Sequence, residues 1–182
     1  MIEYDDEAHT YTLDGVLLPH VTGILRDMMP GYQAGEWYLQ RGKAVHECAA
    51  MILRGEDFDY DPVIAGQVAA ARLFVREYNP IVVEVERIVA HPVLGYAGRL
   101  DAIVALDGRL FVLDWKSSME DSLPYQLVAY ALAYQAETGN KIRNGIGVEL
   151  REDGTYRAET YHGLDLYKAR WRAMLREWKR NG

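Results

Sequence analysis

The chain has 182 residues, of which 49% are hydrophobic and 26% are charged, which suits one globular domain with a substantial core. It contains no apolar run of the ~20 residues that a membrane span requires. A single cysteine, Cys48, excludes an internal disulfide and a metal cluster held by several cysteines. The net charge of −7 argues against broad, nonspecific attraction to nucleic acid. No secretory signal pattern is visible, and we expect a cytoplasmic protein without membrane association.

Residues 2–18 have the pattern of a small β-hairpin with a turn at Asp14-Gly15. Thr22 is predicted to cap a short helix that ends before Pro30-Gly31. The elements that follow are predicted as a helix over 33–54, a loop over 56–63, a helix over 65–78 and a strand over 81–89.

The helix over 33–54 contains a candidate functional histidine. Val45, Ala49 and Ile52 fall on one side at helical spacing and are predicted to pack inward. His46 lies next to this apolar side, where it would border a cleft. It is either a hydrogen-bonded helix histidine or a metal ligand, because a neutral imidazole suits Mn²⁺.

The stretch over 97–118 is predicted to form two strands joined by Asp107-Gly108, a dipeptide that favours a two-residue hairpin turn. Such a turn fixes which residues of the two strands face each other. One face is then apolar and contains the pairs Leu100–Trp115, Ala102–Leu113 and Val104–Phe111.

The other face of this hairpin brings two carboxylates together, because the same register places Asp101 opposite Asp114 and Arg99 opposite Lys116. Opposed Cβ atoms lie about 4.5–5.5 Å apart, where like charges destabilise the pair. A hard divalent cation such as Mg²⁺ or Mn²⁺, bound between them, would remove this repulsion. Lys116 would then lie beside a metal-bound water, a combination suited to phosphodiester hydrolysis. The alternative is a solvated surface pair, since an acid-x-Lys triplet also arises by chance.

Three other polar side chains are candidates for the same site. Glu86, in the strand over 81–89, is either a further carboxylate ligand or a solvent-facing residue. Gln126 and Tyr130 are four residues apart in a helix predicted over 122–138 and share one of its faces. They would bond a nucleic-acid backbone or a catalytic side chain, or form an exposed polar pair.

A second hairpin is predicted from strands over 144–150 and 155–161, followed by a last helix over 164–180. Six basic and two acidic side chains give this helix a net charge of +4, so the rest of the chain carries −11. Four of the basic side chains lie along one face of this helix, where they would either contact successive phosphates of a nucleic acid or face solvent. This basic line consists of Lys168, Arg172, Arg176 and Lys179. The chain lacks the glycine-rich phosphate-binding motif of nucleotide-driven motors, so we expect no nucleotide cofactor.

Four short motifs occur in a fixed order: GKAVH at 42–46, GRLD at 98–101, DWK at 114–116 and QxxxY at 126–130. In this order and at these spacings they resemble the PD-(D/E)xK nuclease superfamily, specifically its RecB-like exonuclease branch. VTGIL at 21–25, followed by the first motif, is similar to the mitochondrial genome maintenance exonucleases and their phage relatives. The resemblance covers about residues 20–135.

The resemblance implies an α/β (α+β) fold over residues 1–182, with a restriction-endonuclease-like core in which helices flank a central mixed β-sheet. It also implies a divalent metal held by Asp101, Asp114, the backbone carbonyl of Trp115 and His46. Lys116 would serve the attacking water, while Gln126 and Tyr130 would support the site or the DNA strand. An iron–sulfur cluster, which one branch of this group binds through four cysteines, is not expected here because Cys48 is alone.

We therefore expect an Mg²⁺- or Mn²⁺-dependent DNA exonuclease that favours single strands or free ends and acts in phage-type recombination or repair. Two alternatives stay open, a structure-specific endonuclease and an inactive nucleic-acid-binding module on the same fold. The sequence leaves open the polarity, the pathway, a homo-oligomer and association with a recombination or replication protein.

Overall fold

The computed structural model describes residues 1–6, 8–30 and 36–181, with the backbone alone for 36–39. The elements in chain order are β1 (Ile2–Asp5), β2 (Thr10–Leu13), β3 (Val16–Leu18), α1 (Val21–Met28), α2 (Glu36–Arg54), the 3₁₀ turn η1 (Pro62–Ile64), α3 (Ala65–Tyr78), β4 (Ile81–His91), β5 (Tyr96–Leu106), β6 (Arg109–Lys116), α4 (Leu123–Thr138), β7 (Asn144–Leu150), β8 (Tyr156–His162) and α5 (Asp165–Asn181).

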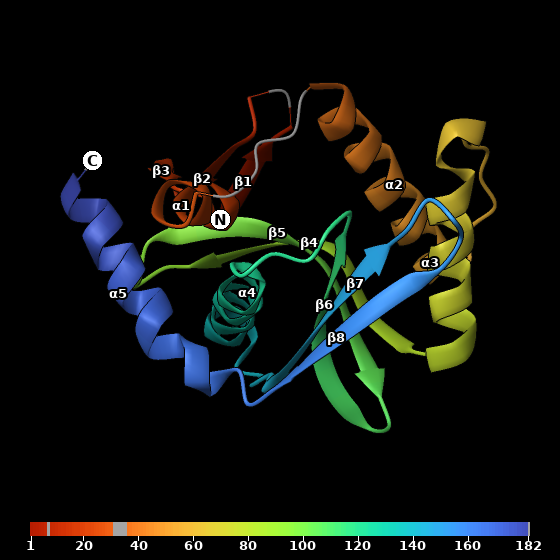
Figure 1. Ribbon diagram of the computed structural model, residues 1–182. Coiled ribbons are helices and arrows are strands. Elements are labelled where there is room, and N and C mark those ends of the chain that lie inside the picture. The colour runs from red at the N-terminus through yellow and green to blue at the C-terminus, as the bar shows by residue number, and fades with distance from the viewer. Residues whose placement is uncertain (7, 31–35, 182) are drawn as a thin grey trace.

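A five-stranded mixed sheet forms the centre of the molecule, with strand order β4-β5-β6-β7-β8. The β6–β7 pair is parallel and the other three pairs are antiparallel. Since parallel neighbours require a crossover, α4 connects β6 to β7 across one face of the sheet. Figure 1 shows α1, α4 and α5 on that face and α2 and α3 on the other. The predicted class, a central mixed sheet flanked by helices, is confirmed.

The predicted hairpin turn at Asp107-Gly108 is confirmed, with Leu106 paired to Arg109. Both turn residues have positive φ, 48° for Asp107 and 73° for Gly108, as a type I′ turn requires. The start of the helix predicted over 33–54 lies outside the described residues, and its described part ends at Arg54 as expected. The predicted loop over 56–63 ends in the 3₁₀ turn η1.

The cap of α1 differs from the prediction. His20, not Thr22, is the N-cap residue, and its Nδ1 accepts a hydrogen bond from the backbone N–H of Gly23 at 3.0 Å. A ring nitrogen acts here as the acceptor that the hydroxyl of a serine or threonine usually provides.

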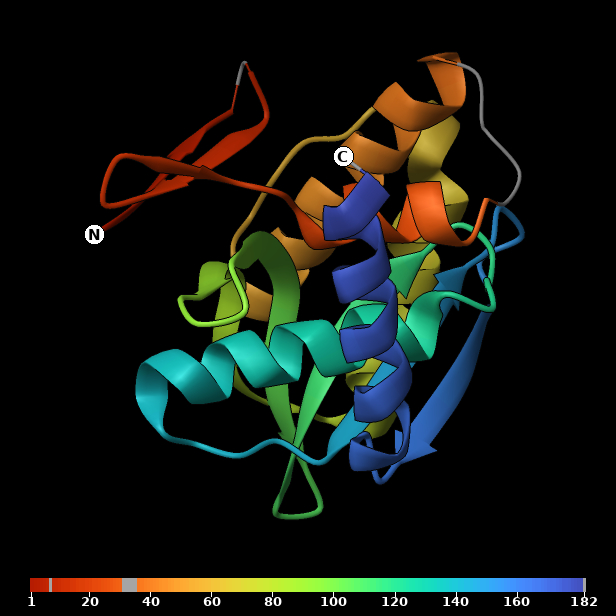
Figure 2. The same ribbon diagram turned by 90° about the vertical axis from the view of Figure 1, so that its left-hand side faces the viewer.

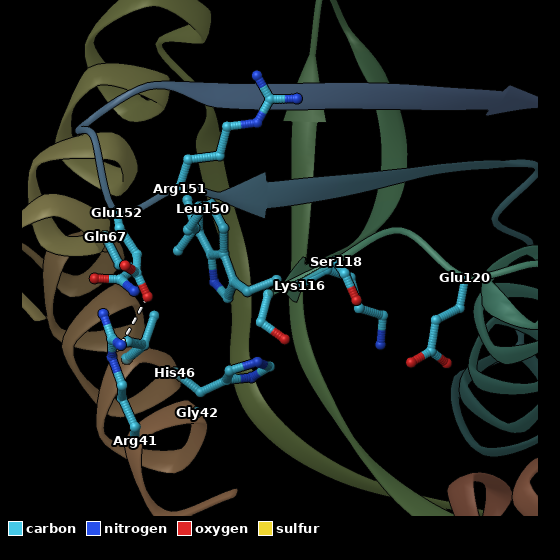
Figure 3. A pocket seen from close by; sticks show the side chains of 13 residues that line it. Arg41, Gly42, His46, Gln67, Lys116, Ser118, Glu120, Leu150, Arg151 and Glu152 are labelled. Carbon is cyan, nitrogen blue, oxygen red and sulfur yellow. Dashed lines mark ion pairs between the residues drawn. The ribbon is translucent and has the colours of Figure 1, made fainter. Parts of the chain in front are cut away.

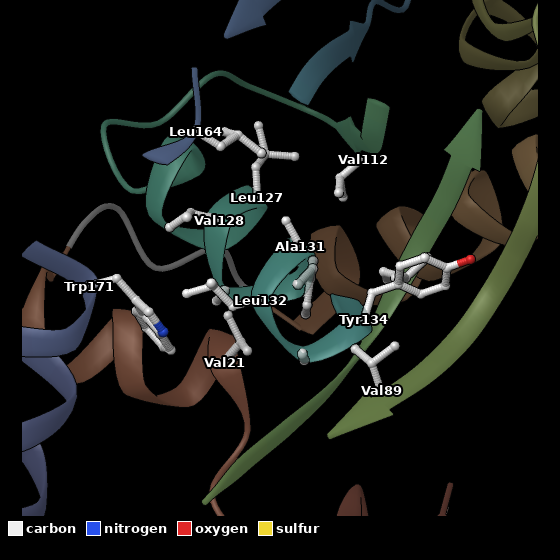
Figure 4. Close-up of a cluster of buried hydrophobic side chains, with 14 of the residues drawn as sticks. Val21, Val89, Val112, Leu127, Val128, Ala131, Leu132, Tyr134, Leu164 and Trp171 are labelled. Atoms are coloured by element: carbon white, nitrogen blue, oxygen red, sulfur yellow. The ribbon is translucent and has the colours of Figure 1, made fainter. Parts of the chain in front are cut away.

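Helix α4 lies at the centre of the larger core, because α1, α5 and the sheet all pack against it (Figure 4). Most of its side chains are buried, and Trp171 of α5 and Val112 of β6 approach it from opposite sides. Among helices of the described residues, none is both long enough and apolar enough to cross a membrane.

A second core lies on the other face of the sheet, where α2 and α3 cover the strands. Cys48 is buried in this core as a small apolar group. Phe74 of α3 packs edge-to-face on Trp115 of β6, with ring centroids 5.4 Å apart. This packing fixes α2 and α3 over the strand that carries Asp114 and Lys116.

The N-terminal strands form a separate three-stranded antiparallel sheet, in the order β1-β2-β3. Figure 2 shows it projecting from the main body beside α2. It is joined to the central sheet by a bridge between His20 and Ala97, and Tyr11 packs with Ala90 and Ala97 beneath it. The predicted hairpin at 2–18 is thus a small sheet that continues the surface around β4 and β5.

Two helical glycines provide opposite tests of this packing. A Cβ on Gly66 would lie 1.8 Å from the backbone oxygen of Glu152, since the β7–β8 turn rests directly on α3. A Cβ on Gly42 would meet no atom of the described residues within 4 Å. We expect Gly66→Ala to reduce the free energy of unfolding by about 1–3 kcal/mol, as overpacking does. Gly42→Ala should increase it by about 0.5–1 kcal/mol through helix propensity.

Urea unfolding followed by circular dichroism measures both changes. Equal effects of the two substitutions would contradict the close contact between α3 and the β7–β8 turn.

Candidate active site

The regular alternation of β5 is interrupted where the first predicted acid occurs. Ala102 and Val104 pack in the core under α2 and α3, and the alternation should place Leu100 there as well. Leu100 instead packs in the core around α4. The predicted apolar face is therefore wrong at Leu100 and correct at its other members, which are Ala102, Val104, Phe111, Leu113 and Trp115. The side chain of Asp101 leaves the strand at this change of face.

The carboxylate of Asp101 accepts a hydrogen bond from β6 at the point where the backbone pairing of β5 with β6 ends. Backbone pairing between these strands ends at Ala102–Leu113, so the predicted pair of Asp101 with Asp114 is not part of the ladder. Instead, the backbone N–H of Trp115 donates to Asp101 Oδ2 at 2.8 Å. His46 Nδ1, from α2, lies 3.2 Å from the same oxygen. Asp101 thus links α2 to the end of β6.

Asp114, Lys116 and Gln126 form a compact polar group beside it. Lys116 Nζ lies 2.6 Å from Asp114 Oδ2 and donates to Gln126 Oε1 at 2.8 Å. The amide of Gln126 donates to Asp114 Oδ1 at 2.8 Å. Tyr130 Oη lies 3.5 Å from the same amide nitrogen, one turn further along α4. The side chains that the sequence singled out on β6 and α4 are therefore brought together.

The two acids have opposite pKa shifts because their neighbours differ. Burial, followed by the charge of Asp101, raises the pKa of Asp114 to about 6, although Lys116 opposes this shift. Burial would also raise the pKa of Asp101, but His46 and the Trp115 N–H outweigh it and lower the pKa. Burial acts to lower the pKa of Lys116, but the carboxylate of Asp114 raises it overall. The lysine therefore stays charged, and Asp114 is the acid whose negative charge is least well compensated.

The donor set fits a hard divalent cation. Mg²⁺ is often held by one or two carboxylates, with phosphate oxygens and waters completing its shell. Asp114 Oδ2 is buried and, apart from its ion pair with Lys116, has no aligned hydrogen bond, so it retains an open lone pair. Within the described ranges, no three His, Cys, Asp or Glu side chains form a ready-made metal cluster. A cation here would thus be held by Asp101 and Asp114, and His46 stays a predicted further ligand.

Glu86, on β4, lies near Asp101, and both side chains line one cavity. It has φ 52°, in the left-handed region, inside strand β4. Burial, and then the nearby charge of Asp101, raise the pKa of Glu86. Its Oε2 lies 3.0 Å from Nε of Arg99, so Arg99 pairs with this acid instead of facing Lys116 as predicted. Glu86 and the carbonyl of Trp115 stay predicted metal ligands.

A cavity of about 500 Å³, which we call the Lys116 cavity, is lined by Lys116 and His46 of the candidate site (Figure 3). Arg41 Nη1 of α2 lies 2.7 Å from Glu152 Oε1 of the β7–β8 turn and closes one wall. Figure 3 shows His46 extending from α2 and Arg151 from the opposite side. Sequence reasoning missed Arg41 and Glu152 as cavity residues, because their contact joins positions 111 residues apart and leaves no local pattern. The remaining wall comes from Gly42, Val45, His46, Gln67, Trp115, Lys116, Ser117, Ser118, Glu120, Leu150 and Arg151.

The predicted basic line on α5 lies on another part of the surface. Helix α5 packs against α1 and α4, not against α2. Lys179 Nζ donates to the backbone oxygen of Leu94 in the β4–β5 turn, at 2.7 Å. Burial lowers the pKa of His91, in the same region, and the charges of Arg172 and Lys168 lower it further. The structure does not bring Lys168, Arg172, Arg176 or Lys179 to the carboxylates, and their role in binding DNA stays a prediction.

No model of a known protein family matches the chain. The chain is 25% identical over 155 residues to mitochondrial genome maintenance exonuclease 1 of Homo sapiens, and the match covers 76% of the chain and 45% of that protein. It is 24% identical over 200 residues to the protein of the same name from Mus musculus, covering 88% of the chain and 59% of the relative. The chain thus spans about half the length of these relatives. The predicted resemblance to this group of exonucleases is confirmed.

Two solved structures are also similar. An alkaline exonuclease from Laribacter hongkongensis has 16% identity and a TM-score of 0.43, and the match covers 86% of this chain and 84% of that one. The crystal structure of SSO0001 has 14% identity and a TM-score of 0.38, covering 79% and 87% of the two chains.

The Gln126 side chain offers a test of the polar group. Gln126→Leu would remove one hydrogen bond from Asp114 and one from Lys116, both in a buried setting. We expect the free energy of unfolding to fall by about 1–3 kcal/mol, the cost of leaving buried polar groups unsatisfied. Urea unfolding at neutral pH measures the change, with Gln135→Leu on the partly exposed side of the same helix as control. An unchanged midpoint for Gln126→Leu would contradict the bridging role.

Proposed function

We propose that this chain is a divalent-metal-dependent deoxyribonuclease, and specifically an exonuclease that prefers single strands or free ends. The similarity to mitochondrial genome maintenance exonuclease 1 supports a nuclease that acts on DNA. Mg²⁺ or Mn²⁺ is the proposed cofactor, without a nucleotide or an iron–sulfur cluster. The proposal treats residues 1–182 as one cytoplasmic catalytic domain that serves DNA recombination or repair.

The single observation that carries this proposal is the convergence of Asp101, Asp114 and Lys116 from adjacent strands. Asp114 has a side chain only 3% exposed, and Lys116 only 18%. Surface pairs of this kind are normally solvated, so burial of three charged groups needs a compensating role. Phosphoryl transfer provides one, because it requires positioned opposite charges around a phosphate.

The residues would divide the work as follows. Asp101 and Asp114 would hold the metal, which supplies polarisation of the phosphate and a lowered water pKa when bound. Lys116, whose pKa is raised, stays an ammonium and donates hydrogen bonds to the attacking water or to a phosphoryl oxygen. Gln126 fixes the direction of that ammonium through its Oε1, 2.8 Å away. His46 orients the Asp101 carboxylate from the α2 side.

Lys116→Ala tests this assignment. We expect the rate of DNA degradation in Mg²⁺ or Mn²⁺ to fall by about 10²–10⁴-fold, the usual contribution of one positioned charged group. Release of acid-soluble nucleotides from a 5′-labelled and a 3′-labelled single strand measures the rate and the polarity. Lys141→Ala is the matched control, because it also removes a lysine that is paired with an aspartate. Lys141 precedes β7, and its partner Asp165 is the first residue of α5.

Equal activity of wild type and Lys116→Ala would reject the role of the lysine. Closed circular DNA separates the alternatives, since only an endonuclease opens it. Binding of DNA without cleavage in any divalent ion would identify an inactive binding module instead.

A further inference from the structure

A second cavity, of about 310 Å³, opens between Asp101 and the small N-terminal sheet. We call it the Arg99 cavity. Gly42 and His46 line it as well as the Lys116 cavity, so the two cavities adjoin along one side of α2. Its floor includes Asp101, and its outer wall comes from the small N-terminal sheet. The lining residues are Tyr4, Asp6, His9, Gly42, Lys43, His46, Glu47, Glu86, Arg99 and Asp101.

His9 presents an exposed aromatic ring to this cavity on a constrained backbone. Its φ of 51° lies in the left-handed region, which non-glycine residues seldom adopt. Tyr4 Oη lies 3.0 Å from its Nδ1, and the ring of His20 meets it edge-on with centroids 5.2 Å apart. Histidine is among the residues that adopt this region in turns, and here the conformation belongs to the short connection between β1 and β2.

Tyr4 supports this ring instead of offering one of its own. Its ring lies 4.7 Å from that of Tyr11 on one side, and the guanidinium of Arg99 lies 5.6 Å from its centroid. Both neighbours restrict access to Tyr4. His9 also has ring neighbours, since Tyr4 and Tyr11 meet it edge-on with centroids 5.8 and 6.0 Å away. Its side chain is nevertheless exposed whereas Tyr4 is half-buried, so His9 is the more accessible ring for a planar ligand.

A cation lies at the same cavity with a weakly held partner. Lys43 Nζ is 3.4 Å from Asp6 Oδ2, and both side chains are 57% exposed. Arg99 Nη1 is 3.8 Å from the other oxygen of Asp6. Exposed pairs of this length contribute little to stability, so a phosphate can replace Asp6 as the partner of Lys43 at small cost.

We propose that the Arg99 cavity binds the nucleotide next to the cleaved bond of a single strand, with its base stacked on His9 and its phosphate beside Lys43. This inference rests on the proposed nuclease function. A single strand that runs along α2 would then place one nucleotide in each of the two cavities. The bond between these two nucleotides would lie at Asp101. Stacking needs an unpaired base, so the subsite selects single strands while tolerating any base identity.

Equilibrium binding of a fluorescein-labelled oligo-dT, followed by anisotropy, tests the stacking. All variants are made in the Lys116→Ala protein, so that the oligonucleotide stays intact. We expect His9→Ala to raise the Kd at least about fivefold, since base–aromatic stacking spans that range and more. His9→Phe keeps a ring and should stay within about twofold of the parent. His162→Ala, an exposed histidine on β8, is the matched control and should change nothing.

The salt dependence of the same binding tests the phosphate contact. Lys43→Gln should lower the slope of log Kd against log salt concentration by about 0.7, the value for one contact to a single strand. Lys141→Gln is the control and should leave the slope unchanged. The inference is overturned if His9→Ala binds like the parent, if His9→Phe loses as much as His9→Ala, or if Lys43→Gln keeps the parental slope. Failure of the parent to bind DNA at all would instead reject the proposed function.

Discussion

The structure around the site depends on the burial of two carboxylates, Asp101 and Asp114, together with one ammonium group, that of Lys116. Asp114 is almost fully buried and its pKa is raised to about 6, so the folded chain holds it at an energetic disadvantage near neutral pH. Lys116 and Gln126 reduce this cost without removing it, because one carboxylate oxygen keeps no aligned hydrogen bond. A divalent cation would complete the compensation, and the large core around α4 supplies the stability that tolerates such a site without it.

The irregular backbone of the central sheet is concentrated at this same place. Pairing of β5 with β6 stops at Ala102, and Leu100 changes to the opposite core. On the neighbouring strand, Glu86 has a positive φ. A regular ladder would aim Asp101 at the α4 side alone, whereas the irregular one lets its carboxylate contact both His46 of α2 and the N–H of Trp115. Departures of this kind re-aim side chains at functional sites.

Local signals predicted what local forces determine. The Asp107-Gly108 turn and the alternation of Val104 and Phe111 fixed one hairpin, because turn geometry and side-chain period act over a few residues. The change of face at Leu100 could not be predicted, since it depends on what α2 and α4 supply from distant parts of the chain. The contacts of Arg99 with Glu86 and Asp6 are also long-range, and the sequence offered Lys116 as an equally plausible neighbour. The location of α5 likewise depends on packing against α1 and α4.

The charge distribution bears on the proposed function, in which an acidic chain would bind a polyanion. The five cations that line the two cavities are each paired with an acid: Arg41 with Glu152, Lys43 with Asp6, Arg99 with Glu86, Lys116 with Asp114 and Arg151 with Glu149. Binding a phosphate there exchanges one anionic partner for another and does not neutralise an open positive surface. The net charge of −7 keeps long-range attraction to DNA weak, so affinity for the proposed substrate would have to come from close contacts inside the cavities. Under the proposed function, only a strand thin enough to enter the cavities would make those contacts. Such a surface would select its substrate first by access to the cavities and only then by charge.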